Sequence, residues 1–544
     1  MGYRSLRELV ETTCGENASR IFLHLPELAG SMTYGEMGRL TGDLARLLSA
    51  AGFRRQERIA VLLNNSSAAA IALLGVTAAR GVAVPLNPKL THAEINWLLE
   101  HSQARFILTD AQQAGDLLPG NERWELLIPG GKQQTGTPLV LIERLPREFA
   151  EESVLETSAP DWTDPAIILY TSGTTGKPKG VILTHGNLLS NARGVQEAHQ
   201  LTPEDTALCI LPLFHINGLV VTLITSMLVG ASLVLPKKFS VRHFWQWIST
   251  YSVSWFSAVP TILSILLFEP IPSKAAFSSL RFARCASAPL PIAVLEEFEA
   301  RTGVRVIESY GMSEAGGQVT SNPLHRRKPG SAGLPFTNAL RIVDEHDAPL
   351  GANQTGEVIL RGPNVTLGYL DNAAANRESF RDGWFHTGDL GYCDAEGYVF
   401  LVGRSKELIN RAGEKIAPRE IEEIIYRLPE VESAAVVGVP DSLYGEEVAS
   451  FLVLRPGLTL TEERIAAHCS ECLAEFKIPK QVFFVEELPK GPNGKIQRRR
   501  LLEMYAPLIQ SKTRRLPHEE VVSSSHSGSN GPDRGARTRA ATAR

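Results

Sequence analysis

Residues 171–180 (TSGTTGKPKG), rich in glycine and hydroxyl side chains, have the composition of a phosphate-binding loop. Glycines let a backbone approach a ligand closely, and consecutive N–H groups form a concavity that holds anionic oxygens. Lys177 and Lys179 add positive charge, and the apolar stretch 167–170 before the segment is typical of a buried strand. The segment predicts a polyphosphate site rather than a polar surface turn, although its spacing is not that of the GxxxxGK[ST] loop.

Other residues suited to the same ligand follow further along the chain. The stretch 310–314 (YGMSE) joins an aromatic ring to Glu314, a hard carboxylate of the kind that binds magnesium. Asp389 ends an aromatic-rich stretch, and Lys495 follows a loop of glycine and proline. Taken singly, these residues have structural explanations, since an aspartate can cap a helix and a basic run such as 495–500 is usually solvated.

The elements that must position these residues alternate between strand and helix patterns over about the first 400 residues. Short apolar runs predict strands, and the stretches between them have helical spacing. The predicted strands are 58–63, 104–109, 231–235 and 304–307, and the predicted helices include 67–80 and 92–101. This order predicts an α/β fold with largely parallel sheets. The runs 340–344 and 356–361 instead predict a small antiparallel β unit.

After Gly403 the pattern changes to that of a compact α+β domain of about 100 residues. It comprises helices at 419–428 and 461–475 and strands at 431–438, 449–454 and 481–485. We therefore expect a large N-terminal domain of layered α/β subdomains over 1–403 and a small α+β C-terminal domain over 404–508. Residues 509–544, rich in serine, glycine and arginine, are expected to form a disordered basic tail.

The composition excludes several classes of protein. With 544 residues, of which 43% are hydrophobic and 21% charged, the chain is neither globally disordered nor a small disulfide-linked scaffold. The net charge of −4 argues against a nucleic-acid partner. The six cysteines form no framework, which fits a reducing compartment. Cys469 and Cys472 form a CxxC without the second pair of a zinc site, so they are expected to be ordinary thiols.

Targeting and membrane insertion are not predicted. Charged residues precede any long apolar run at the N-terminus, unlike in a signal peptide. The uncharged stretch 219–235 approaches the length of a membrane span, but Gly230 interrupts it, so we expect a buried helix followed by a buried strand. These features favour a cytoplasmic protein without stable membrane insertion.

Six motifs, in order, identify the chain as resembling the adenylate-forming superfamily, which includes acyl-CoA synthetases, peptide-synthetase adenylation domains and luciferases. They are 171–180 (TSGTTGKPKG), 310–314 (YGMSE), 356–362 (GEVILRG), 384–389 (WFHTGD), 403–407 (GRSKE) and 489–496 (PKGPNGKI). The resemblance spans about residues 30–508. Within the superfamily, 407–415 (ELINRAGEK) and 494–499 (GKIQRR) look like the branch of oxalyl-CoA synthetases and related short-acid CoA ligases.

This resemblance implies a two-step reaction that uses ATP, Mg²⁺ and coenzyme A. A carboxylate attacks the α-phosphorus of ATP and releases pyrophosphate, and a thiol then displaces AMP to give a thioester. The implied ATP-binding residues are Thr171, Ser172, Gly173, Thr174, Thr175, Gly176, Lys179, Ser287, Ala288, Tyr310, Gly311, Ser313, Asp389 and Arg404. Ser313 stands where most relatives have threonine and keeps the hydroxyl donor.

The resemblance also assigns the remaining roles. Glu314, with Thr171, is the implied metal ligand. Lys495 is the implied catalytic cation, which enters the site during adenylation and neutralises charge on the acyl carboxylate and the α-phosphate. Lys406 marks the hinge of the mobile C-terminal domain. In the second half-reaction Gly413 would let the thiol-bearing arm pass close to the backbone.

The acyl pocket is expected near the stretch 214–218 (FHING), where His215 contacts the carboxylate or gates the thiol tunnel. The implied acyl- and CoA-binding residues are His215, Asn217, Gly316 and Gly413. The oxalyl branch carries a histidine soon after the metal-ligand glutamate and a hydroxyl residue at position 289, where this chain has 315–318 (AGGQ) and Pro289. This departure predicts that the cation for a second carboxylate is absent. It favours a short- to medium-chain monocarboxylic acid or an aryl acid over oxalate.

Alternative functions differ in the thiol acceptor or in catalysis itself. The same first half-reaction could load the acid onto the phosphopantetheine of a carrier protein, but no carrier domain follows in the chain, which favours free CoA. A luciferase-like oxygenase has no specific support in the sequence. A non-catalytic nucleotide-binding protein on this fold would be expected to have lost Lys495, Glu314 or the phosphate loop, all of which are present.

Overall fold

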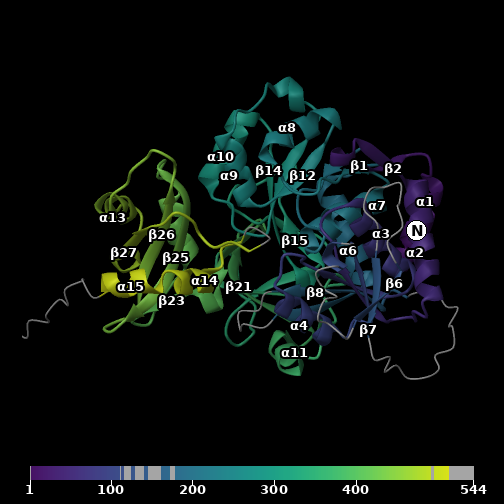
Figure 1. Cartoon of the computed structure of the whole chain (residues 1–544). Coiled ribbons are helices and arrows are strands. Elements are labelled where there is room, and N and C mark those ends of the chain that lie inside the picture. Colours follow the sequence, from purple (N-terminus) through teal and green to yellow (C-terminus); the bar gives the residue numbers. More distant parts are fainter. Residues whose placement is uncertain are drawn as a thin grey trace, which may run out of the picture.

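The computed structural model describes residues 2–110, 112–114, 124–128, 140–144, 161–171, 178–491 and 495–513. Within these ranges the chain forms a large N-terminal part and a smaller C-terminal part that stands to one side of it (Figure 1). In the same ranges we find no helix with the length and apolarity that crossing a membrane requires.

The first sheet of the N-terminal part joins strands from the beginning and the middle of the chain. Its strands are β1 (Ile21–Leu25), β2 (Gly30–Thr33), β10 (Thr206–Leu208), β11 (Ser232–Val234), β12 (Trp255–Ala258), β13 (Phe282–Cys285), β14 (Val306–Met312), β15 (Gly317–Ser321) and β16 (Leu334–Pro335). Their spatial order is β16-β15-β14-β13-β12-β10-β11-β1-β2. The pairs from β11 through β10, β12 and β13 to β14 are all parallel, as the sequence predicts. Strand β15 then turns back antiparallel to β14.

The second sheet holds the strands that flank the predicted phosphate loop. Its strands are β3 (Arg58–Leu62), β4 (Val82–Leu86), β5 (Phe106–Thr109), β6 (Trp124–Ile128), β7 (Val140–Arg144), β8 (Pro165–Thr171), β9 (Lys179–Thr184) and β19 (Gly368–Tyr369). Their order is β19-β9-β8-β4-β3-β5-β7-β6. Strands β8 and β9 pair antiparallel, with Thr171 opposite Lys179, so the phosphate loop connects the two strands of a hairpin.

Helices fill the space between the two sheets and cover their outer faces. The inner helices are α1 (Leu6–Glu16), α2 (Tyr34–Ala50), α3 (Ser67–Ala78), α6 (His185–His199), the π-helix η2 (Asn217–Ile224) and α7 (Thr225–Val229). They share one apolar core with both sheets. The predicted buried helix and strand of 219–235 are confirmed as η2, α7 and β11.

The outer helices complete the layers. They are α8 (Val241–Thr250), α9 (Pro260–Phe268) and α10 (Ile292–Thr302) on the first sheet and α4 (His92–Ser102) on the second. Short 3-10 helices occur at η1 (Pro26–Leu28), η3 (Lys274–Phe277) and η4 (Ser313–Ala315). Figure 1 shows α8, α9 and α10 together at the top of the molecule. The layered arrangement confirms the predicted α/β class.

A small antiparallel sheet follows, as the sequence predicts. Its strands are β17 (Ala339–Val343), β18 (Gly356–Arg361), β20 (Phe380–Arg381), β21 (Trp384–Cys393) and β22 (Val399–Arg404), and α11 (Ala373–Ser379) precedes β20. In the β21–β22 pair Asp389 lies directly opposite Arg404. The pairing of these two strands thus positions two residues that are predicted to bind ATP.

The C-terminal part is a sheet with helices on both faces. Its elements are η5 (Ser405–Glu407), β23 (Ile409–Arg411), β24 (Glu414–Ile416), α12 (Pro418–Ile425), β25 (Val431–Asp441), β26 (Gly445–Leu454), α13 (Glu462–Ser470), η6 (Glu475–Lys477), β27 (Gln481–Phe484), α14 (Arg498–Met504) and α15 (Ala506–Thr513). Helices α12 and α13 cover one face and α14 and α15 the other.

Two C-terminal predictions need correction. The helix predicted over 461–475 ends at Ser470, and 475–477 form a separate 3-10 turn. The tail predicted from residue 509 cannot begin there, because α15 continues to Thr513 and Ile509 is buried against the sheet. Residues 514–544 lie outside the described residues.

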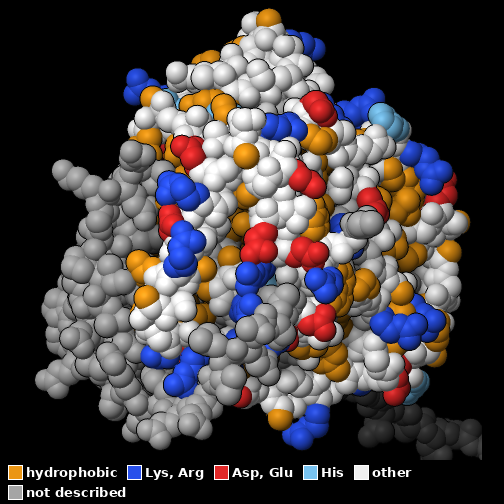
Figure 2. Space-filling model, turned by 90° about the vertical axis from the view of Figure 1, so that its right-hand side faces the viewer, with side chains coloured by type: hydrophobic (Ala, Val, Ile, Leu, Met, Phe, Trp, Pro, Cys, Tyr) orange, Lys and Arg blue, Asp and Glu red, His pale blue; other side chains and the backbone are white. Residues whose placement is uncertain are grey.

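The face of the N-terminal part that is remote from the C-terminal part carries interspersed basic and acidic side chains (Figure 2). This mixture agrees with the nearly balanced charge of the chain, 55 basic against 59 acidic residues. Such a surface offers no single-sign field of the kind that attracts a polyelectrolyte.

Candidate active site

Three of the residues predicted to bind ATP, each from a different strand, meet in the candidate site. The Tyr310 hydroxyl donates to Asp389 Oδ2 at 2.5 Å, and Arg404 Nε pairs with Asp389 Oδ1 at 2.8 Å. Burial, and then the nearby Asp389 carboxylate, raise the pKa of Tyr310 well above its usual value, so its hydroxyl remains a donor. The cluster holds an aromatic ring, a carboxylate and a guanidinium together through these contacts, and all three residues are predicted to bind ATP.

A second cluster combines hard oxygens with a cation. Glu314 lies in η4, directly after β14, and its Oε1 accepts a hydrogen bond from the Tyr369 hydroxyl at 3.0 Å. Lys179 Nζ lies 4.8 Å from the centre of the Tyr369 ring. The Glu314 carboxylate and the Thr171 hydroxyl are donors of the type that Mg²⁺ prefers, so these residues fit the predicted metal site. The predicted loop residues Ser172, Gly173, Thr174, Thr175 and Gly176 lie outside the described residues.

These clusters surround two adjoining cavities of about 970 and about 250 Å³. The predicted residues that line the larger one are Thr171, Lys179, His215, Asn217, Ser287, Gly311, Ser313, Glu314, Arg404, Lys406 and Lys495. Those that line the smaller one are Ser287, Ala288, Tyr310, Gly311, Asp389, Arg404 and Lys495. Four residues belong to both linings: Ser287, Gly311, Arg404 and Lys495.

Lys495 comes from the C-terminal part and reaches the N-terminal residues. It lines both cavities together with Arg404. Burial and the Arg404 charge lower the pKa of Lys495, while Glu407 and Asp389 act in the opposite direction. The structure thus brings a cation from one domain to residues of the other that are predicted to bind the nucleotide.

Two predicted residues lie away from the cavities. Gly413 sits in the turn between β23 and β24 with φ of 97°, and an added Cβ there would meet open space. Gly316 adopts φ of 66°, and an added Cβ would lie 3.2 Å from the carbonyl oxygens of Asn187 and Asn364. Gly316 therefore forms a tight turn behind Glu314 rather than a cavity wall. Neither glycine lines either cavity.

His215 and Asn217, which are predicted to bind the acyl group, line the larger cavity together with Ser287. Burial lowers the pKa of His215 to about 4, so the ring is neutral at pH 7. Its Nε2 is buried and makes no hydrogen bond within the described ranges. Asn217 begins the π-helix η2, a conformation often found at functional sites. Its amide nitrogen donates to Ser287 Oγ at 3.3 Å.

Behind Asn217 lie polar residues that the motifs did not identify. Arg284 is 2% exposed and donates to Ser257 Oγ at 2.9 Å, to Gln318 Oε1 at 3.1 Å and to Asn217 Oδ1 at 3.3 Å. Arg284 lies one hydrogen bond behind the wall of the larger cavity but belongs to the lining of neither cavity, so the absence of a cation for a second carboxylate stays a prediction. The available signal was an arginine inside the apolar strand pattern 282–285 (FARC).

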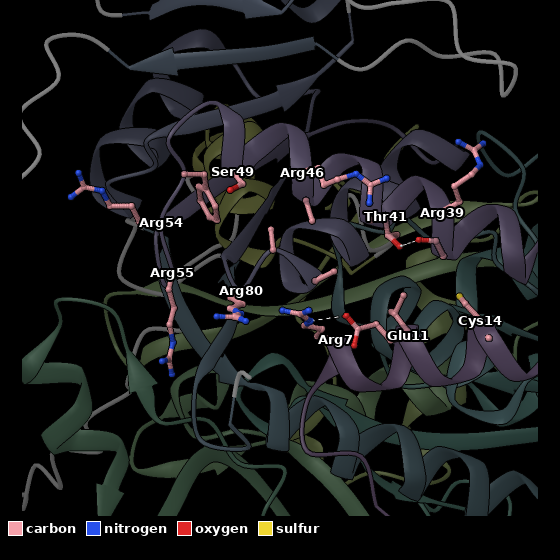
Figure 3. Close-up of a pocket in the computed structure, with 18 of the residues that line it drawn as sticks. Arg7, Glu11, Cys14, Arg39, Thr41, Arg46, Ser49, Arg54, Arg55 and Arg80 are labelled. Atoms are coloured by element: carbon pink, nitrogen blue, oxygen red, sulfur yellow. Dashed lines mark hydrogen bonds and ion pairs between the residues drawn. The ribbon is translucent and has the colours of Figure 1, made fainter. Parts of the chain in front are cut away.

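A larger cavity of about 1640 Å³ lies elsewhere, between α1, α2 and the loop after α2 (Figure 3). None of the motif residues lines it. Several of its arginines are matched by acids: Arg7 pairs with Glu11 at 2.7 Å, Arg39 with Asp43 at 2.8 Å and Arg55 with Asp164 at 2.8 Å. Its size alone does not make it the candidate site.

Comparisons with known proteins agree with this geometry. Residues 10–370 match the family of AMP-binding enzymes, and residues 420–495 match the AMP-binding enzyme C-terminal domain. The chain is 39% identical to the sulfoacetate–CoA ligase of Cupriavidus necator, over 92% of this chain and 98% of the relative. It is 40% identical to the oxalate–CoA ligase of Arabidopsis thaliana, over 84% and 90%.

Among solved structures, the chain resembles the o-succinylbenzoate coenzyme A synthetase of Bacillus subtilis in complex with ATP and magnesium ion. The TM-score is 0.76 with 31% identity, and the match covers 91% of this chain and 98% of that structure. These similarities confirm the resemblance inferred from the motifs, including its short-acid CoA ligase branch.

Proposed function

We propose a residue-by-residue account of catalysis, starting from the premise that this chain belongs to the AMP-binding enzyme family. Relatives with about two-fifths of their residues identical over most of both chains are acid–CoA ligases. The protein is an AMP-forming acid–CoA ligase: it activates a small carboxylic acid with ATP in the presence of Mg²⁺ and transfers the acyl group to CoA. The roles of individual residues below are our proposal.

In the first step a carboxylate oxygen of the acid attacks the α-phosphorus of ATP, and the bond to pyrophosphate breaks. Tyr310 stacks on the adenine, while Asp389 and Arg404 bind the ribose. Ser313 and Lys495 stabilise the negative charge that gathers between carboxylate and α-phosphate, because preorganised donors and cations act most strongly where charge develops. Glu314 and Thr171 would hold Mg²⁺, which when bound neutralises phosphate charge.

In the second step the CoA thiolate attacks the carbonyl carbon of the acyl-adenylate, and the carbon–oxygen bond to AMP breaks. We propose that the C-terminal domain, bounded by Gly403 and turning at Lys406, rotates between the steps. Lys495 then leaves, and the Gly413 turn replaces it beside the thiol-bearing arm. Support comes from the positions seen here, since Lys495 lines the cavities and Gly413 does not.

The acid is short, of medium length or aromatic, and the relatives named for sulfoacetate and oxalate handle short acids. A cytoplasmic location is also part of the proposal, and the free thiols of the six cysteines support it. The single observation that carries the function is the convergence of Lys495 with Arg404 and Ser313 on one cavity.

The test is to incubate the protein with ATP, Mg²⁺, CoA and a panel of carboxylic acids and to identify products by mass. We expect an acyl-CoA, AMP and pyrophosphate. Acyl-AMP without acyl-CoA would point to a carrier-protein thiol as the acceptor. If none of the acids gave acyl-AMP or acyl-CoA while the folded protein bound ATP, the proposed function would be wrong.

A further inference from the structure

The acyl side of the site holds a buried cation without a counter-charge. Arg284 is 2% exposed in β13. Its hydrogen bonds go through Nε and Nη1 to three neutral groups: Gln318, Ser257 and Asn217. Across the part of the chain that the structure describes, it forms no ion pair with any aspartate or glutamate. An isolated buried charge costs several kcal/mol, so an arginine kept in this state needs an anion from elsewhere.

The charge of Arg284 is present at physiological pH. Burial lowers its pKa to about 10, which still leaves the guanidinium protonated at pH 7. Neither His199, which contacts Gln318, nor His215, which lines the larger cavity, adds to this charge. Burial lowers the pKa of His215 to about 4. Burial, and then the charge of Arg284, lower the pKa of His199 to about 3. Both rings are therefore neutral at pH 7. The net charge of the cluster is therefore positive.

Arg284 is connected to the cavity wall through hydrogen bonds of fixed direction. Asn217 Oδ1 accepts from Arg284 Nη1 at 3.3 Å and from Ser257 Oγ at 2.8 Å, so the amide nitrogen, which donates one hydrogen bond to Ser287 Oγ at 3.3 Å, is the end that faces away from Arg284. Asn217 itself lines the larger cavity, beside His215 and Ser287. The guanidinium thereby fixes Asn217 as a donor toward the acyl end of the site.

Gln318 repeats this arrangement on the other side of Arg284. Its Oε1 accepts from Arg284 Nε at 3.1 Å and lies 3.1 Å from His199 Nε2. Its Nε2 is buried and has no hydrogen-bond partner among the described residues. An unpartnered buried donor is costly, and it is the second, independent sign that an acceptor is missing from the cluster.

We propose that the acyl site takes a short acid with a second anionic group, a carboxylate or a sulfonate, and that Arg284 sets this preference as a positioning residue behind Asn217 and Gln318. This rests on the proposed acid–CoA ligase function. The reacting carboxylate cannot supply the missing counter-charge, because it faces the α-phosphate and becomes an ester of AMP. The far end of the acid is the remaining source, and the low dielectric of the site makes the attraction strong.

The test uses pairs of acids that differ in charge but little in shape. Malonate is compared with 3-methylbutyrate, in which an isopropyl group replaces the second carboxylate. Sulfoacetate is compared with 3,3-dimethylbutyrate, in which a tert-butyl group replaces the sulfonate. The readout is kcat/KM for pyrophosphate release. We expect the wild-type protein to favour at least one anionic acid over its neutral counterpart by tenfold or more, and the two pairs distinguish carboxylate from sulfonate.

Variants then assign the preference to Arg284. Arg284→Met should reduce the anionic-to-neutral ratio tenfold or more, mainly through KM of the anionic acid, and Arg284→Lys should restore part of it. The matched control is Arg305→Met, which removes an exposed arginine just before the neighbouring strand β14 and should leave the ratio unchanged. Gln318→Met keeps the charge of Arg284 but removes the oxygen that accepts a hydrogen bond from Arg284 Nε. This variant should lower the anionic-to-neutral ratio of kcat/KM several-fold.

A wild-type protein that favours the anionic acid of neither pair would overturn the inference while leaving the ligase function intact. So would a folded Arg284→Met protein with an unchanged ratio. If Arg284→Met fails to fold, Gln318→Met and the wild-type ratio decide. Absence of pyrophosphate release with every acid tested, by a protein that binds ATP, would instead count against the proposed function.

Discussion

At the scale of single residues, a short series of contacts links polar and charged side chains of the two domains. Tyr310 donates to Asp389, Asp389 pairs with Arg404, and Lys495 lies beside Arg404 in the lining of both cavities. Lys495 is the member that arrives from the C-terminal domain. Its proposed role is therefore the most sensitive to removal.

Replacing Lys495 by alanine should abolish adenylation and spare the second step. The adenylate transition state loses a cation at the point where charge develops, so acid-dependent ATP–pyrophosphate exchange should fall by about 10²–10³-fold. Acyl-CoA formation from supplied acyl-adenylate should stay within about threefold, because Lys495 is proposed to have left the site by then. Arg499→Ala, which removes an exposed basic residue paired with Glu503 at 3.0 Å, is the control. Equal losses in both half-reactions would show that the assigned role is wrong.

The sequence predicted the residues whose chemistry is carried by a motif, and it missed those defined by geometry. Tyr310, Asp389 and Arg404 could be named because each lies in a recognisable local stretch. Arg284 and Gln318 could not, because they are far apart in the chain and their importance comes from burial beside Asn217. A charge without a counter-ion is a property of packing, which no local pattern records.

At the scale of elements, β14 carries both Tyr310, which is proposed to stack on the adenine, and Glu308, a buried acid. Glu308 is 8% exposed, and it accepts a hydrogen bond from the Gly330 amide at 2.8 Å. Burial raises its pKa from 4.5 to about 7 against the opposing effect of that hydrogen bond. Arg419 of α12 and Arg327 act to lower the pKa, and Glu423 of α12 acts to raise it. The folded protein thus binds a proton here that the unfolded chain releases at lower pH.

Glu308→Gln should therefore stabilise the protein at pH 8 and not at pH 4.5. Between pH 4.5 and 7 the folded state binds more protons at this site than the unfolded state, so the wild-type protein loses stability as pH rises through that window. Glutamine removes this loss, on the order of 1–3 kcal/mol. The measurement is urea unfolding of both proteins at a series of pH values, with Glu345→Gln, at an 87% exposed side chain, as control. A stability difference that does not grow with pH would contradict the assignment.

The hairpin of β23 and β24 gives a second prediction at this scale. Gly413→Ala adds a methyl group at φ of 97°, so it strains the turn proposed to guide the thiol-bearing arm. We expect CoA-dependent thioester formation to fall at least tenfold and ATP–pyrophosphate exchange to change less than threefold. Gly457→Ala is a matched control, since that glycine also has a positive φ, 78°, and open space around it. A similar loss in both half-reactions would refute the division of roles between Lys495 and Gly413.

Element boundaries were predicted well where the apolar period was strong and poorly where a tertiary contact decides. The strand predicted at 431–438 is β25, which continues to Asp441 because it pairs with β26 along its whole length. The π-helical winding of 217–224 was not predictable, since an apolar run has no period that distinguishes π from α.

At the scale of the whole molecule, the site lies where two domains meet. Arg455 after β26 pairs with Glu297 of α10 at 3.4 Å, and Arg419 donates to the Leu401 carbonyl at 2.7 Å. These polar contacts join the two parts in the arrangement in which Lys495 lines the cavities. The motif order predicted both domains, but their relative placement needed the structure.

The most direct test of this account follows the oxygen atoms of the acid. An acid that the protein uses as a substrate is labelled with ¹⁸O in its reacting carboxylate and incubated with the protein, ATP, Mg²⁺ and CoA. The masses of the products are then measured by mass spectrometry. Attack on the α-phosphorus followed by thiolysis must leave one ¹⁸O atom in AMP for each acyl-CoA formed, and none in pyrophosphate. Label in orthophosphate together with ADP would show an acyl-phosphate route and would contradict the central claim.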